Sequence, residues 1–105
     1  MKGDFRMNLQ MARFKVKPES VVEFEAAATR IFEALQQTAP AGVRYISCRL
    51  SDGVTYQALL ELDDGVENPL PELPEGKAFL DNLRNWIAEP PIRDQLTVIG
   101  SYRFF

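Results

Sequence analysis

The sequence has no histidine and only one cysteine, Cys48, among its 105 residues. Serine and cysteine nucleophiles therefore lack their usual imidazole base, and a haem or metal ion lacks its commonest side-chain ligand. A lone cysteine forms no internal disulfide, and without a second thiol or an imidazole it builds no metal site. We predict that Cys48 is instead a small residue of the buried core, because free cysteine is among the most buried residue types.

Basic residues are also scarce, since 12 Lys and Arg stand against 15 Asp and Glu, for a formal net charge of −3. No run of basic residues is present that would neutralise a row of phosphates, which argues against nucleic acid as a partner. No apolar run approaches the roughly 18 residues that cross a bilayer, and the first six residues do not resemble a secretory signal. We expect a cytoplasmic protein with no membrane partner.

No internal repeat or low-complexity segment divides the chain. Its 46% hydrophobic and 26% charged residues are close to the averages of globular proteins. We predict a single domain over residues 1–105. A domain of this size buries little surface on its own, so pairing with a second subunit would stabilise it.

The apolar residues recur with alternating strand and helix periods, in the order strand, helix, strand, strand, helix, strand. The first strand changes phase at Met11 and Ala12, which predicts a bulge there. Ser20 and Glu23 fit a capping box for the first helix. The predicted strands are 7–16, 43–50, 54–62 and 96–104. The first predicted helix follows 17–20 and ends at 39–42, and the second begins near 74–75 and ends before 90–91.

This order predicts an α+β, ferredoxin-like βαββαβ sandwich, in which an antiparallel four-stranded sheet carries both helices on one face. We expect the helices to cover Ile46, Cys48, Leu50, Tyr56, Leu60, Val98 and Tyr102. The opposite face would then present Arg13, Tyr45, Arg49, Gln57, Leu59, Glu61, Ile99 and Arg103. Because that face mixes apolar and charged residues, we predict that it packs against a second copy in a homodimer.

Three segments resemble the antibiotic biosynthesis monooxygenase-like proteins of the dimeric α/β barrel superfamily. They are the strand-to-helix entry Phe14-Lys15-Val16-Lys17-Pro18-Glu19, the helix opening Lys77-Ala78-Phe79-Leu80, and the proline-rich step into the last strand. The resemblance, which spans nearly the whole chain, implies a homodimer with a shared barrel and a ligand pocket between each sheet and its helices. Some members are cofactor-free oxygenases, some degrade haem, and many have no assigned activity.

The haem-degrading branch of this family implies an Asn on the first strand, a Trp on the second helix and an axial His. Ala12 and Asn82 occupy the first two positions here, and the chain has no histidine. We therefore expect no haem or other cofactor. The acidic loop 63–68 likewise lacks the ligand spacing of a calcium site, and we interpret 63–75 as a stiff surface loop beside the cleft.

A cofactor-free oxygenase needs polar groups that hold a developing oxyanion, and the sequence offers Tyr56, Trp86 and Asn82 as pocket candidates, with Tyr45 and Asn85 also available. Each has a structural alternative, because Trp86 lies on the apolar stripe of its helix and Tyr56 alternates with apolar residues. The asparagines fit an exposed helix surface equally well. Two hypotheses stay open: a cofactor-independent monooxygenase acting on a small aromatic compound, and a non-enzymatic module that binds a small apolar or aromatic ligand or simply assembles as a dimer.

Overall fold

The computed structural model describes residues 8–104, so the predicted start of the first strand at Met7 lies outside the described residues. The elements follow the predicted order. They are β1 (Asn8–Lys15), η2 (Pro18–Ser20), α1 (Val21–Thr38), β2 (Val43–Arg49), β3 (Thr55–Leu62), η3 (Leu70–Glu72), α2 (Pro74–Trp86) and β4 (Ile92–Leu96), where η denotes a 3-10 turn.

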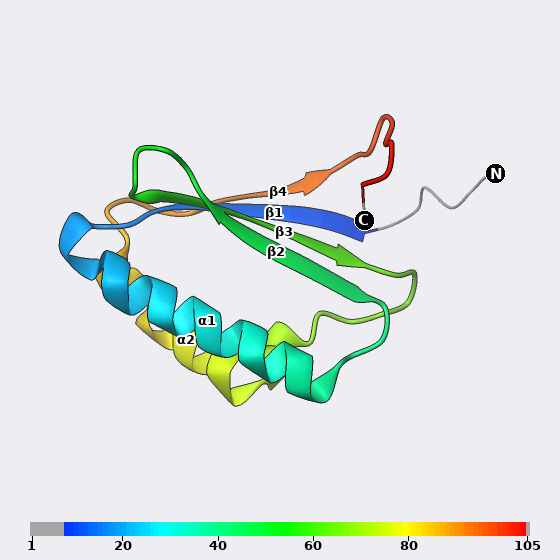
Figure 1. Ribbon diagram of the computed structural model, residues 1–105, viewed down its shortest axis with the longest axis horizontal. Coiled ribbons are helices and arrows are strands. Elements are labelled where there is room, and N and C mark those ends of the chain that lie inside the picture. The colour runs from blue at the N-terminus through cyan, green and yellow to red at the C-terminus, as the bar shows by residue number, and fades with distance from the viewer. Residues whose placement is uncertain (1–7, 105) are drawn as a thin grey trace.

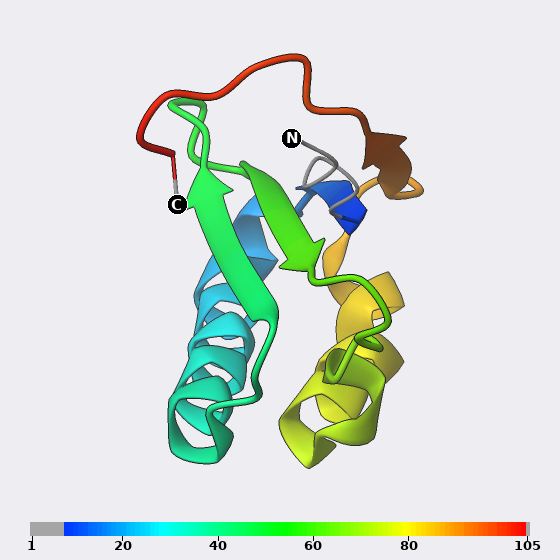
Figure 2. The same ribbon diagram turned by 90° about the vertical axis from the view of Figure 1, so that its right-hand side faces the viewer.

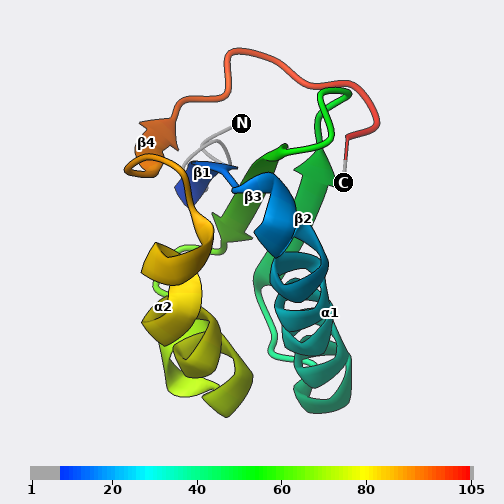
Figure 3. The same ribbon diagram turned by 90° about the vertical axis from the view of Figure 1, so that its left-hand side faces the viewer.

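The four strands form one antiparallel sheet in the order β2-β3-β1-β4. Both helices cover the same face of this sheet (Figure 1). Seen from the end, α1 lies beneath β2 and β3, whereas α2 lies beneath β1 and β4 (Figure 3). The predicted ferredoxin-like sandwich is confirmed, and one face of its sheet, here called the open face, has no helix over it.

An aromatic cluster joins the helices to the sheet. Phe24 of α1 lies at its centre, with its ring centroid 4.6 Å from Tyr56 of β3, 5.3 Å from Phe79 and 6.2 Å from Trp86, both of α2. Phe14 of β1 completes the group at 6.0 Å from Phe24. All five side chains are buried. Aromatic pairs of this kind contribute roughly 0.5–1.5 kcal/mol each beyond the area they bury, so this cluster fixes how α1 and α2 sit on the sheet.

The position predicted for the last strand, 96–104, is wrong. The Ala88 amide donates to the Lys15 carbonyl at 2.7 Å, so the chain leaving α2 already lies beside β1. The strand is therefore Ile92–Leu96, and its ladder ends where Leu96 pairs with Leu9, the second residue of β1. The following segment 97–104 passes above the open face without forming a strand (Figure 2).

Residues assigned to sheet faces in that segment are consequently on neither face. Ile99 is fully exposed and Tyr102 is 80% exposed, and Val98 and Arg103 also lie in irregular chain. The alternation that suggested a strand here is real in the sequence, but beyond the Leu9–Leu96 pair the described part of β1 has only Asn8.

The predicted faces of the second strand are inverted. The hairpin register pairs Tyr45 with Leu60 and Arg49 with Tyr56, so Tyr45 and Arg49 face the helices as their β3 partners do. Ile46 and Leu50 are instead exposed, and so is Cys48. Cys48 is therefore not a core residue. The faces predicted for β3 are correct, with Tyr56 and Leu60 buried under the helices.

Two local predictions also fail. The β1 ladder pairs every residue from Asn8 to Lys15 with β3 without interruption, so there is no bulge within it. Ser20 makes no side-chain cap for α1, because the preceding turn η2 continues into the helix and the Val21 amide donates to the Pro18 carbonyl. At the other end α1 stops before Ala39, which adopts a left-handed conformation at φ 45°.

Candidate functional site

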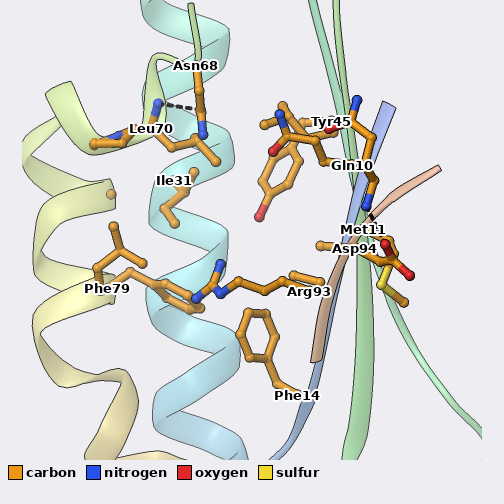
Figure 4. Close-up of a pocket in the computed structure, with 17 residues that line it drawn as sticks. Gln10, Met11, Phe14, Ile31, Tyr45, Asn68, Leu70, Phe79, Arg93 and Asp94 are labelled. Atoms are coloured by element: carbon orange, nitrogen blue, oxygen red, sulfur yellow. Dashed lines mark hydrogen bonds between the residues drawn. The ribbon is translucent and has the colours of Figure 1, made fainter. Parts of the chain in front are cut away.

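A cavity of about 560 Å³ lies between the sheet and the helices. Its volume falls within the range of small-molecule sites, roughly 300–1,000 Å³. The helix-facing side of β1 and β3, together with α1, α2 and η3, supplies an apolar wall (Figure 4). This wall includes Phe14, Ile31, Ala58, Leu60, Leu70 and Phe79.

The two edge strands of the sheet each direct a polar side chain into this cavity. Tyr45 comes from β2 and Arg93 from β4, and Figure 4 shows the hydroxyl and the guanidinium both pointing between the sheet and the helices. The Arg93 guanidinium lies over the Phe14 ring, 5.7 Å from its centroid, in cation–π contact. The Tyr45 ring stacks on Phe32 of α1, with centroids 5.0 Å apart.

Burial raises the pKa of the Tyr45 hydroxyl, and the positive charge of Arg93 only partly opposes this shift. At neutral pH the hydroxyl is therefore a neutral hydrogen-bond donor rather than a base. Asn68, in the loop before η3, also lines the cavity. Its side-chain oxygen accepts the Leu70 amide at 2.9 Å, which leaves its NH₂ group to donate to a ligand.

A group of three amide side chains lies at the β1–β4 side of the cavity. The Asn8 side-chain oxygen accepts from Gln10 at 3.2 Å and from Gln95 at 2.6 Å. Gln10 and Gln95 both line the cavity, next to Arg93. The shared acceptor holds the two amides in place, so this side of the cavity offers fixed polar groups.

Tyr56 lies in the aromatic cluster rather than on the cavity wall. Its hydroxyl donates to the Glu25 carboxylate, and Arg49 binds the same carboxylate at 2.8 Å. Desolvation, reinforced by Glu25, raises the pKa of Tyr56 to about 12. The hydroxyl is thus satisfied within a network that links α1 to β2 and β3.

Trp86 and Asn82 do not line the cavity; they line a smaller hollow of about 250 Å³ between the two helices. Trp86 is buried against Phe24 and Phe79. Asn82 is exposed, and its side-chain amide donates to the Ala78 carbonyl at 2.8 Å within α2. The structure therefore does not bring Tyr56, Trp86 and Asn82 together around one cavity.

Sequence reasoning missed Arg93, Gln10 and Asn68, and it named Tyr45 but placed it on the wrong face. The sequence carries little signal for Arg93, because three consecutive polar residues lie between Ile92 and Leu96 and the segment lacks the alternation typical of a strand. Among residues 8–104 no cluster of three or more His, Cys, Asp or Glu side chains is placed to hold a metal ion. None of the helices in that range combines the length and apolar character needed to cross a bilayer.

The sequence matches no family model and no curated protein. Solved structures do resemble the fold. A protein of Nitrosomonas europaea, named as a candidate antibiotic biosynthesis monooxygenase, superposes with a TM-score of 0.76 at 16% identity, over 94% of this chain and 96% of that one. One from Caulobacter crescentus with the same description gives a TM-score of 0.71 at 20% identity, over 90% and 91%.

A conserved protein from Methanosarcina mazei gives a TM-score of 0.73 at 18% identity, over 90% of this chain and 94% of that one. At these identities the structural similarity establishes the fold, but neither an activity nor a ligand. The resemblance to antibiotic biosynthesis monooxygenase-like proteins is thus confirmed at the level of the fold.

Proposed function

We propose that this protein binds a small aromatic compound in the cavity between sheet and helices and oxidises it with O₂ without a cofactor. One observation carries the proposal: an apolar, partly aromatic wall faces side-chain donors from Tyr45 and Asn68 across a single cavity. The wall suits a flat apolar ring system, and the donors suit an oxygen on that ring.

The donors indicate the type of chemistry. A hydroxylated aromatic compound with an activated CH₂ group forms an enolate when it loses a proton, and the enolate reacts directly with O₂. Tyr45 remains protonated at neutral pH, because burial raises its pKa, and so donates to the enolate oxygen. Preorganised donors of this kind stabilise the charge that develops in the transition state.

The reaction balances without any other reductant. The carbon that loses its proton takes up O₂ and a proton to give a hydroperoxide, R₂CH–OOH. Loss of water from that group leaves the ketone, so R₂CH₂ and O₂ give R₂C=O and H₂O. The substrate supplies all the electrons, and one oxygen atom enters the product.

Oxygen uptake tests this proposal. We expect the purified protein to consume one O₂ per ketone formed from a hydroxylated anthrone, in buffer treated with a chelator. Tyr45→Phe should lower kcat by roughly 10-fold or more, as loss of an oxyanion donor does elsewhere. The control is Tyr102→Phe, which removes an exposed hydroxyl of the C-terminal segment. Uptake no faster than without protein contradicts the oxygenase function.

A second function, ligand binding without turnover, is favoured by a different observation. Asp94 is the one carboxylate among the described residues that line the cavity, and it pairs with Met11 on the open face rather than facing the helices. The cavity therefore has no carboxylate directed into it to act as a base, and the substrate proton would pass to solvent. Stabilisation by the anthrone without oxygen uptake supports the binding module instead.

We further propose that the protein is a homodimer joined through its open faces. Leu59 lies between Met11 and Ile46 on this face, and Ile46 and Ile92 are 42% and 54% exposed in the single chain. Glu61 on the same face is bound by Arg44, which also binds Asp63. The open face thus has apolar side chains at its centre and ion-paired charges beside them. This composition is typical of a surface that a second subunit covers.

A further inference from the structure

We infer that the ligand of the cavity is an aromatic acid whose anionic group binds Arg93. This inference rests on the proposed function, because it takes the same cavity as the binding site. It adds the chemical class of the ligand, which neither the fold nor its solved relatives supply.

Arg93 is a cation that the protein leaves available. Its guanidinium carries five N–H donors and no acceptor. The ion pairs among the described residues involve Arg44 and Arg49, and none involves Arg93. The side chain extends from β4 across the Phe14 ring toward Phe79, into the cavity (Figure 4). Cation–π contact orients the guanidinium but leaves its edge donors for a ligand.

Among the described residues, the one charged side chain directed into the cavity is positive, although the chain as a whole is negative. Asp94 lies on the opposite face of β4 and accepts its hydrogen bond from the Gln95 amide at 2.8 Å. The side chains of Gln10, Tyr45 and Asn68 that line the cavity are neutral, since Tyr45 keeps its proton. An anion that enters therefore meets one cation and several donors, whereas an ammonium group would meet Arg93 unfavourably.

The position of Arg93 also sets where the anionic group lies. Arg93 belongs to an edge strand and is itself exposed, so its guanidinium stands at the mouth of the cavity, with Phe14 and Phe79 beside it. A ligand ring would pack against these aromatic side chains while a carboxylate at its edge takes a two-point hydrogen bond from Arg93. Planar carboxylates match the guanidinium fork better than the point charge of lysine does.

A matched ligand pair tests the inference. We would titrate the full-length protein with 2-naphthoate and with 2-naphthamide, which share a ring and differ in charge, and measure both dissociation constants by calorimetry. We expect the acid to bind at least 10-fold more tightly than the amide. In Arg93→Gln that preference should disappear, and in Arg93→Lys it should be reduced. Arg84→Gln, a change of the same type on the exposed surface of α2, should keep it.

Equal binding of acid and amide by the wild type would overturn the inference, and so would a preference that survives in Arg93→Gln. In both cases the cavity still binds an aromatic ring, so the proposed site would stand without its acid specificity. Binding of neither compound would overturn the inference together with the proposed ligand site. Oxygen uptake from a neutral anthrone, measured separately, distinguishes failure of the oxygenase from failure of the acid specificity.

Discussion

Tyr45 and Tyr56 face the same helices from neighbouring strands, yet their hydroxyls have different environments. The Tyr56 hydroxyl is held by Glu25 within a network that includes Arg49. The Tyr45 hydroxyl opens into the cavity. The raised pKa values of both follow first from burial, but only Tyr45 is placed to meet a ligand. A shifted pKa alone therefore does not locate the site in this protein.

Tyr56→Phe should destabilise the fold by about 1 kcal/mol at neutral pH, the usual net value of one hydrogen bond. The pKa of Tyr56 is about 12 in the folded state, above its ordinary value of 10.0. Its contribution is therefore complete below about pH 10 and is lost as the pH rises toward 12, because the unfolded chain ionises first. The stability advantage of the wild type over Tyr56→Phe should shrink over that interval.

Urea denaturation of both proteins from pH 7 to 11.5 measures this difference. Tyr102→Phe, which removes an exposed hydroxyl, is the control at neutral pH. A wild-type advantage that stays constant across the whole range would contradict the role assigned to the Tyr56 network.

At the scale of elements, α2 and η3 approach so closely that only glycine fits between them. A Cβ on Gly76 would lie 2.0 Å from the Leu70 carbonyl oxygen, and both residues line the cavity. Gly76→Ala must therefore move η3 or the start of α2. We expect a loss of roughly 2 kcal/mol in the free energy of unfolding, in the range of overpacked cores, and weaker ligand binding.

The control for this change is Gly100→Ala, where a Cβ would meet nothing within 4 Å. Chemical denaturation and the 2-naphthoate titration measure the two effects. Unchanged stability in Gly76→Ala would contradict this prediction, because it would show that η3 and α2 move apart with no loss in the free energy of unfolding.

The elements differ in how far the sequence predicts them. Both helices and the 43–62 hairpin follow from periodicity and turn residues, because those signals are local. The faces of β2 do not, since Ile46 and Cys48 alternate with Tyr45 and Ser47 and both sets contain apolar atoms. The hairpin register decides between them. The site is less predictable still, because Tyr45 and Arg93 converge only once β2 and β4 occupy opposite edges of the sheet.

At the scale of the whole molecule, the proposed dimer buries the open face in its interface. Leu59→Asp would place a carboxylate between Met11 and Ile46, at the centre of that apolar strip. We expect the wild type to sediment as a dimer and Leu59→Asp as a folded monomer, because an unpaired buried charge costs several kcal/mol.

Analytical ultracentrifugation at micromolar concentration, with circular dichroism as the check on folding, makes this measurement. Val22→Asp introduces the same charge at an 81% exposed position of α1, away from the sheet, and should stay dimeric. A monomeric wild type, or a dimeric Leu59→Asp, would contradict the proposed interface.

The edge position of β4 has a further consequence. This strand has only five residues and only β1 as a neighbour, so it is among the parts of the sheet that open most readily. It also carries Arg93. A ligand bound to Arg93 stabilises only those conformations in which β4 is paired with β1. Ligand binding and the pairing of β4 are therefore thermodynamically linked. Amide hydrogen exchange along β4 would then slow in proportion to ligand concentration, while β3, flanked on both sides, would keep its own rate.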